Sequence, residues 1–210
     1  MSTFDERFIN QLRVRLRQEV PGWKAQQRMA TEVHRRARLK PRADARQAAV
    51  LMLLYPDGEE AYLPLIVRPT YPGVHSGQIA LPGGKVEEED GSLTATALRE
   101  TEEEIGVSVP ESRVLGSLTQ LYIPPSNMLV TPVVAYAFEK PTYHPDLREV
   151  VQVLDFSLEA FRNPQNQLTR QVTAAADIRL QVPCFVIEER TIWGATAMMM
   201  SELLAVLDTL

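Results

Sequence analysis

Residues 84–107 constrain this chain more than any other stretch, because they place four glutamates on one short helix directly after a pair of glycines. The stretch reads GKVEEEDGSLTATALRETEEEIGV. At about 100° per residue, Glu100, Glu103 and Glu104 share one face of that helix. A separate face can pack into a core and carries Thr94, Leu98, Thr101 and Ile105. The pattern predicts a helix that ends at Gly106, where a left-handed residue is wanted.

The glutamate face predicts a site for a hard divalent cation. Carboxylates at these spacings repel and raise one another's pKa, and a divalent cation removes the repulsion. Oxygen ligands with no His or Cys nearby favour Mg²⁺ or Mn²⁺ over zinc. The alternative is a solvated acidic surface, which is the usual meaning of a glutamate run. We adopt that interpretation for Glu87, Glu88 and Glu89, which precede the helix.

The same residues resemble the Nudix box, in which a glycine and an acid precede Arg-Glu, a Glu pair and a closing glycine. The matching residues are Gly84, Asp90, Arg99, Glu100, Glu103, Glu104 and Gly106. Asp90 stands where a glutamate is usual, with one extra residue before Arg99, and Thr101 takes a position that is normally aliphatic. Neither departure touches the Arg-Glu and Glu-Glu core, and a match of this many elements rarely arises by chance.

Segments outside the box resemble the coenzyme A pyrophosphatases among the Nudix hydrolases. Upstream, residues 65–85 read LIVRPTYPGVHSGQIALPGGK, with an arginine and a His-Ser-Gly run before Pro-Gly-Gly. Residues 124–136, 148–158 and 192–197 are similar to further segments of that subfamily. The resemblance implies an α/β/α sandwich with a mixed sheet, and divalent-metal-dependent hydrolysis of a diphosphate.

The resemblance also implies roles for the acidic residues. It places the metal on Glu100, Glu104 and the backbone carbonyl of Gly83, with Glu103 as a further ligand or as the base that deprotonates water. The sequence leaves that choice open, because coupled carboxylates share their titration. Glu149, expected to open a late strand, is either a second catalytic carboxylate near the metals or an exposed acid at a strand end.

Two residues upstream of the box are candidates for substrate binding. Arg68 follows a predicted strand, and its guanidinium can grip two phosphate oxygens. His75 is either a phosphate donor or general acid, or a loop histidine that only makes a hydrogen bond. Within the box, Arg99 should pair with Asp90. Four box residues are expected to hold the loop and helix in place rather than react: Gly84, Asp90, Arg99 and Gly106.

The leading hypothesis for the function is cleavage of coenzyme A or its thioesters into 3′,5′-ADP and 4′-phosphopantetheine or its acyl form. A pyrophosphatase for ADP-ribose or another nucleoside diphosphate derivative is the alternative, because the box specifies diphosphate chemistry but little about what is attached. A module that binds a nucleotide without hydrolysing it is disfavoured by the intact glutamates.

Composition and charge exclude other classes of protein. The 210 residues carry a net charge of −5, and there is no basic stripe for nucleic acid. No signal peptide precedes the first residues and no apolar run approaches the roughly 20 residues of a membrane span, so we expect a cytoplasmic protein without membrane partners. The single Cys184 lies in an apolar run, which fits a buried, inert thiol.

The pattern divides the chain into a helical segment with a linker at residues 1–46 and a Nudix hydrolase domain at residues 47–210. Residues 4–20 predict a packed helix with an apolar stripe at Phe4, Phe8, Leu12 and Leu16. That stripe needs a partner surface, either in this chain or in a homodimer. The basic residues 34–42 are expected to form a solvated linker, with contact to a phosphate as the alternative.

Short apolar runs in the second region predict strands at residues 48–55, 62–67, 114–121, 129–138, 150–156 and 180–187. A turn at residues 56–60 separates the first two. Residues 196–207 predict an amphipathic C-terminal helix. Mixed strands with helices on both sides form a three-layer sandwich, which agrees with the α/β/α arrangement that the resemblance implies.

Overall fold

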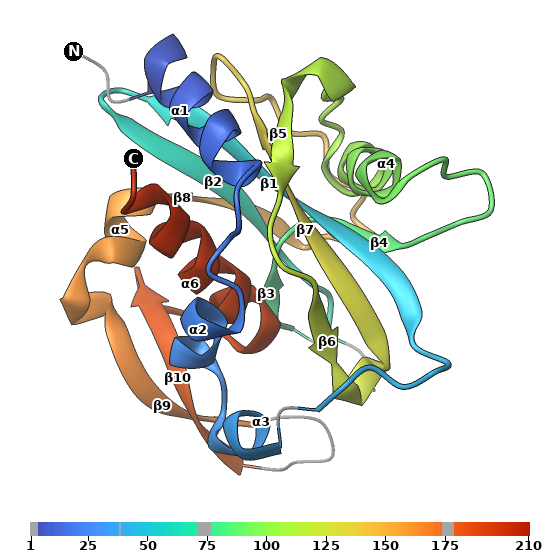
Figure 1. The fold of residues 1–210 in the computed structure, drawn as a ribbon, viewed down its shortest axis with the longest axis vertical. Helices are drawn as coiled ribbons and strands as arrows, with labels where there is room; N and C mark the ends of the chain where they lie inside the picture. The colour runs from blue at the N-terminus through green and yellow to red at the C-terminus, as the bar shows by residue number, and fades with distance from the viewer. Residues whose placement is uncertain (1–3, 38, 71–76, 174–178) are drawn as a thin grey trace.

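The computed structural model describes residues 4–37, 39–70, 77–173 and 179–210 (Figure 1). Its helices are α1 (Glu6–Leu16), α2 (Trp23–Gln26), α3 (Glu32–Ala37), α4 (Leu93–Ile105), α5 (Leu158–Arg162) and α6 (Gly194–Leu207). Short 3₁₀ turns are η1 (Gln27–Met29), η2 (Glu111–Arg113), η3 (Pro124–Ser126) and η4 (Pro164–Asn166). Its strands are β1 (Arg46–Asp57), β2 (Glu60–Val67), β3 (Ile79–Ala80), β4 (Gly83–Lys85), β5 (Val114–Ser117), β6 (Leu121–Ile123), β7 (Met128–Tyr136), β8 (Gln152–Ser157), β9 (Gln167–Thr173), β10 (Arg179–Ile187) and β11 (Arg190–Trp193).

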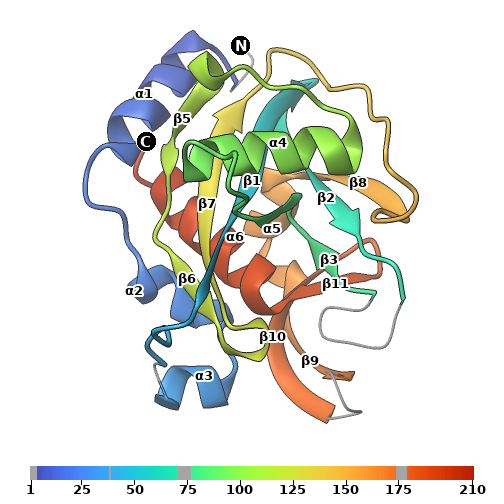
Figure 2. The same cartoon turned by 90° about the vertical axis from the view of Figure 1, so that its right-hand side faces the viewer.

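The main sheet is mixed and centres on β1 and β7. Its strand order is β3-β2-β1-β7-β5, with β4 also paired to β1, β6 to β7 and β8 to β2. β1 and β7 run parallel, whereas the neighbouring pairs are antiparallel. Figure 2 shows α4 crossing in front of this sheet, with α6 behind it. The predicted α/β/α sandwich is therefore confirmed.

β1 is buried on both faces, and its side chains alternate between two hydrophobic clusters. Leu51 and Leu53 belong to the cluster that includes Ala97 of α4. Met52 and Leu54 belong to the cluster that includes residues of α1 and α6. Because successive side chains of a strand point to opposite faces, one apolar run anchors helices on both sides. The cluster on the α4 side fixes the helix that carries the glutamates.

The N-terminal helices share the core of the main sheet. Phe4, Leu12 and Leu16 are buried, and Phe8 packs against the same cluster. The apolar stripe of α1 thus finds its partner surface within this chain, which removes the reason given for a homodimer. A dimer and the boundary between residues 46 and 47 stay predictions.

Five predicted strands correspond to β1, β2, β7, β8 and β10, with ends shifted by at most two residues. Three other predictions were wrong. Residues 34–37 belong to α3 rather than to a linker, and the His34 ring lies 5.6 Å from that of Trp23. Residues 114–121 hold β5 and only the first residue of β6, because the pairing with β7 shifts by one residue between Ser117 and Leu121. The C-terminal helix is buried nearly all round rather than amphipathic, since α1, α2 and the small sheet surround it.

The small sheet has the order β11-β10-β9 and is antiparallel. Sequence analysis missed β9, whose side chains are almost all exposed and carry no apolar alternation. Cys184 is buried in β10, and burial raises the pKa of its thiol, as expected of an inert residue. In the part of the chain that the structure describes, none of the helices is both long and apolar enough to span a bilayer.

Candidate active site

α4 is fixed at both of its ends. The Ser92 Oγ accepts a hydrogen bond from the Ala95 backbone N–H at 3.0 Å, which caps the first turn. Gly106 ends the helix in the left-handed conformation, with φ +69°, as its position in the sequence predicted. A Cβ there would come within 2.6 Å of the His144 Cβ. Thr101, the departure from the family pattern, is buried and its hydroxyl donates to Ala97 O.

The two glycines of β4 bring its backbone close to its neighbours on both sides. A Cβ on Gly83, whose φ is +146°, would come within 2.3 Å of the Ala49 carbonyl oxygen on β1. A Cβ on Gly84 would come within 2.3 Å of the Glu100 carboxylate. Only residues without a side chain let the strand pass this closely between β1 and α4. The glycine pair therefore sets the distance between the β4 backbone and the first glutamate.

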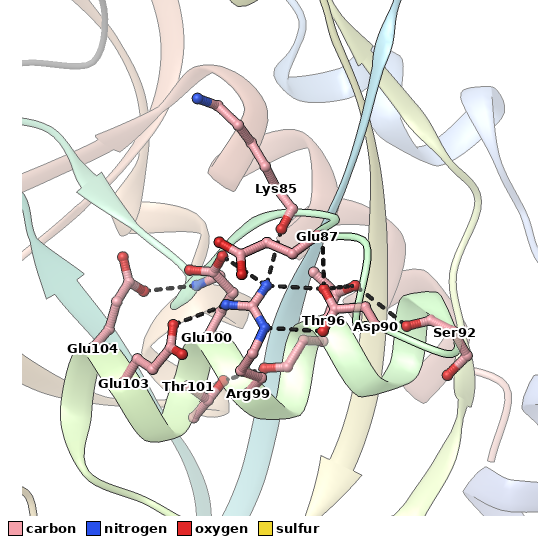
Figure 3. A network of polar contacts seen from close by, with 12 residues as sticks. Lys85, Glu87, Asp90, Ser92, Thr96, Arg99, Glu100, Thr101, Glu103 and Glu104 are labelled. Carbon is pink, nitrogen blue, oxygen red and sulfur yellow. Dashed lines mark hydrogen bonds and ion pairs between the residues drawn. The ribbon is translucent and has the colours of Figure 1, made fainter.

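Arg99 holds the loop before α4 against the helix (Figure 3). Its Nε and Nη2 each donate to one carboxylate oxygen of Asp90 at 2.9 Å, the pairing that the sequence predicted. Nη2 also donates to the Lys85 carbonyl at 3.1 Å. Asp90 further accepts from the Thr96 hydroxyl and the Glu87 backbone N–H. These donors, the Arg99 guanidinium above all, hold the pKa of Asp90 well below its usual value.

The three box glutamates lie in different environments. Glu103 is exposed and accepts from Arg99 Nη1 at 2.8 Å. Glu100 is largely covered, its Oε1 lies 3.2 Å from Arg99 Nη2, and burial raises its pKa. Glu104 is only 2% exposed, although the helical spacing grouped it with the other two. It accepts from the Gly83 N–H at 2.7 Å, and burial raises its pKa to about 7.

Arg68 reaches this site from the end of β2. Its Nη2 donates to the Gly83 carbonyl oxygen at 3.3 Å and lies 3.6 Å from Glu104 Oε1. The side chain is 27% exposed, so it is partly open to solvent. The residue predicted to bind a phosphate is thus in contact with two of the predicted metal ligands.

The prediction that Glu149 opens a strand was wrong. Glu149 lies exposed in a turn before β8. Two backbone hydrogen bonds join the preceding segment to the end of α4, from His144 N to Ile105 O at 2.8 Å and from Asp146 N to Glu104 O at 3.0 Å. Burial is the main cause of the raised pKa of Glu100 and Glu104, and the Glu149 charge adds to it. Sequence reasoning missed the attachment at residues 144–146, for which no local motif exists.

His75 lies outside the described residues. Among those that are described, no group of three or more His, Cys, Asp or Glu side chains is arranged to hold a metal ion together. Instead, Glu103 and Glu100 contact Arg99, and Glu104 contacts Arg68. The donors nevertheless suit a hard divalent cation, because they are carboxylate oxygens and a backbone carbonyl oxygen, which the glycine pair of β4 brings close together. Binding such a cation requires these ion pairs with the arginines to separate.

The chain is similar to proteins of one known family. The sequence pattern of the NUDIX domain matches residues 45–175. The chain belongs to the Nudix family. This Nudix hydrolase is 34% identical over 164 residues to "Mitochondrial coenzyme A diphosphatase NUDT8" of Mus musculus, covering 77% of each protein. It is also 34% identical over 156 residues to "Uncharacterized Nudix hydrolase NudL" of Yersinia enterocolitica, covering 74% of this chain and 78% of that protein.

Solved structures show the same fold. A MutT/nudix family protein from Enterococcus faecalis aligns with a TM-score of 0.56 at 18% identity, over 91% of this chain and 76% of that one. The Nudix hydrolase RenU from M. smegmatis aligns with a TM-score of 0.52 at 19% identity, over 79% of this chain and 88% of that one. Nudix hydrolases act on small nucleotide derivatives and generally require a divalent metal ion, which the oxygen donors at α4 and β4 suit.

Proposed function

We propose that this Nudix hydrolase cleaves the pyrophosphate bond of coenzyme A or its thioesters, with Mg²⁺ or Mn²⁺, into 3′,5′-ADP and 4′-phosphopantetheine or its acyl form. The observation that carries the proposal is the complete set of box glutamates in a chain similar to proteins named as coenzyme A diphosphatases. Those relatives include NUDT8 of Mus musculus and of Homo sapiens, at 34% and 33% identity. The peroxisomal NUDT7 of Mus musculus is 34% identical over 125 residues.

In this proposal Glu100, Glu104 and the Gly83 carbonyl hold the cation. When bound, the cation neutralises charge that builds on the phosphate oxygens and lowers the pKa of water. The Arg68 guanidinium binds a phosphate oxygen, which its partly exposed position allows. The proton of the attacking water passes to Glu103 or Glu149, both exposed carboxylates.

The substrate is tested by incubating the purified protein and Mg²⁺ with a panel of coenzyme A, acetyl-coenzyme A, ADP-ribose and other nucleoside diphosphate derivatives. We expect 3′,5′-ADP to accumulate from coenzyme A, as followed by chromatography. Fast cleavage of ADP-ribose without release of 3′,5′-ADP from coenzyme A would reject the proposal and select the alternative substrate class. Omitting the metal and adding EDTA should stop the reaction, and Mg²⁺ or Mn²⁺ should restore it.

The remaining parts of the proposal concern location and partners. A small, coenzyme A-like nucleotide is the proposed binding partner, and nucleic acid and membranes are not. The net charge of −5 supports this, since it gives no general attraction to polyanions. A cytoplasmic location stays a proposal, to be tested by fractionation of cells that express the protein.

A further inference from the structure

Arg68 occupies the position between two oxygens that the proposed cation would need. Its Nη2 lies 3.3 Å from the Gly83 carbonyl oxygen and 3.6 Å from Glu104 Oε1. Glu104 is 2% exposed, and a buried carboxylate is costly unless a positive charge or hydrogen bonds compensate it. In the described part of the chain, Arg68 is the one cation within ion-pair distance of Glu104.

The two arginines of the site are held very differently. Arg99 makes paired hydrogen bonds of 2.9 Å with Asp90 and further ones of 3.1 Å or less with Lys85 O and Glu103. Such a fork is strong and specific. Among the described residues, the Arg68 side chain makes one hydrogen bond, whose 3.3 Å length is near the upper limit for hydrogen bonds, and one 3.6 Å contact that is electrostatic only. Releasing the Arg68 guanidinium from these two oxygens therefore breaks one long hydrogen bond and one ion pair.

Hydrogen bonds hold the backbone of Arg68 and of its neighbour Val67. The Arg68 N–H donates to Gln78 O at 3.0 Å, and the adjacent Val67 O accepts from the Val151 N–H at 2.9 Å. The arginine stem has several rotatable bonds, so its head group can move without any change in the strand. A divalent cation on Glu104 and the Gly83 carbonyl would stand beside the guanidinium and repel it.

We propose that Arg68 is a resident counter-ion, which competes with the divalent cation for Glu104 and the Gly83 carbonyl and moves to a substrate phosphate when the cation binds. Metal binding and phosphate binding are then coupled through one side chain. The competition follows from the contacts of Arg68 alone, and only the move to the phosphate rests on the proposed function. Arg68 thus lowers metal affinity in the absence of substrate and raises it in its presence.

The competition is tested by titrating the EDTA-treated full chain with Mn²⁺, without substrate, at a pH that keeps Glu104 ionised. Arg68→Met removes the charge and keeps the apolar stem, so its Kd for Mn²⁺ should fall about tenfold, within the usual range for coupled sites. Arg68→Lys keeps the charge and should bind Mn²⁺ within about twofold of the wild type. Should Arg68→Met fail to fold, Arg68→Gln is the second uncharged variant.

The matched control is Arg162→Met, which removes the same charge from α5. Arg162 is 35% exposed and pairs with Glu159 and Asp208, and neither partner belongs to the site. Its Kd for Mn²⁺ should equal that of the wild type. A Kd of Arg68→Met or Arg68→Gln that equals or exceeds the wild-type value would overturn the competition.

The move to phosphate is tested with ADP as a diphosphate probe, by measuring its Kd with and without Mn²⁺. Mn²⁺ should strengthen ADP binding to the wild type by a larger factor than to Arg68→Met. Equal factors would overturn this step. The Mn²⁺ titration contains no substrate, so its result is independent of whether coenzyme A is hydrolysed, and failure of the proposed function is recognised separately by the substrate panel.

Discussion

At the scale of single residues, Glu104 combines an ionisable carboxyl group with almost complete burial. Replacing it with Gln keeps the size and an acceptor for the Gly83 N–H but removes a charge. We expect kcat to fall by about two orders of magnitude or more, the scale of losing one group that acts in the transition state. The metal-free protein should be as stable as the wild type or more stable, because a neutral amide is less costly to bury.

Steady-state kinetics with Mg²⁺ and urea unfolding in EDTA measure these two effects for Glu104→Gln. Glu103→Gln should lower kcat similarly, with little change in stability because Glu103 is exposed. Glu88→Gln is the control, since Glu88 lies exposed in the loop and should keep nearly full activity. Near-wild-type turnover of Glu104→Gln at saturating Mg²⁺ would reject this face of α4 as the metal site.

Asp90 gives a prediction about pH. Its folded pKa lies below the ordinary value of 3.8 because Arg99, chiefly, stabilises the ionised form. Its stabilising contribution is therefore fully present above about 3.8 and is lost as the pH falls towards the folded pKa. The Asp90→Asn protein lacks this contribution at every pH. The difference in unfolding free energy between wild type and variant, measured with urea, should shrink on acidification, and a constant difference would contradict it.

At the scale of elements, the two adjacent glycines of β4 face different neighbours, Gly83 the backbone of β1 and Gly84 a side chain of α4. Gly84→Ala places a Cβ against the Glu100 carboxylate, the far end of a flexible side chain, so the fold can tolerate it. We expect activity to fall more than about tenfold, because a displaced ligand disturbs the site. The melting temperature should change little, as measured by differential scanning calorimetry.

Gly83→Ala should behave in the opposite way. Its Cβ would meet the Ala49 carbonyl of β1, which cannot turn aside, and its φ of +146° is unfavourable for alanine. The melting temperature should fall clearly, by an amount that corresponds to about 1–3 kcal/mol or more of backbone strain. If the two variants were equally destabilised, the glycines would not have the separate roles that the geometry assigns to them.

At the scale of the whole molecule, Glu202 of α6 joins the N-terminal helices to the main domain. Its carboxylate is fully buried and accepts from Gly22 N, Gln26 Nε2 and Thr119 Oγ1 at 2.7 to 2.9 Å. Glu202→Ala removes the acceptor of these donors, of which, among the residues described, only Gln26 Nε2 keeps another, Thr119 O, and each buried donor left unpaired costs about 1–3 kcal/mol. Urea unfolding should show a loss of several kcal/mol, whereas kcat of the folded fraction should stay near that of the wild type.

Glu202→Gln is the conservative variant for comparison with Glu202→Ala. Glu202→Gln keeps one carbonyl oxygen as an acceptor and should recover part of the lost stability. If Glu202→Ala proved as stable as the wild type, residues 4–29 would not depend on this carboxylate for their position. The expected dependence implies that a chain truncated before β1 exposes the apolar surface that α1 covers, and that truncation is a poor test of the domain boundary.

The sequence by itself determined the features that depend on local spacing. The end of α4 at Gly106, the Arg99–Asp90 pair across one loop and five of the strands follow from neighbours in the chain, and the match to the Nudix box identified the fold. Tertiary packing alone decided the burial of Glu104, the position of Arg68 over Gly83, the attachment of residues 144–146 to α4 and the place of β9. These depend on contacts between segments far apart in sequence, whose distances no local periodicity encodes.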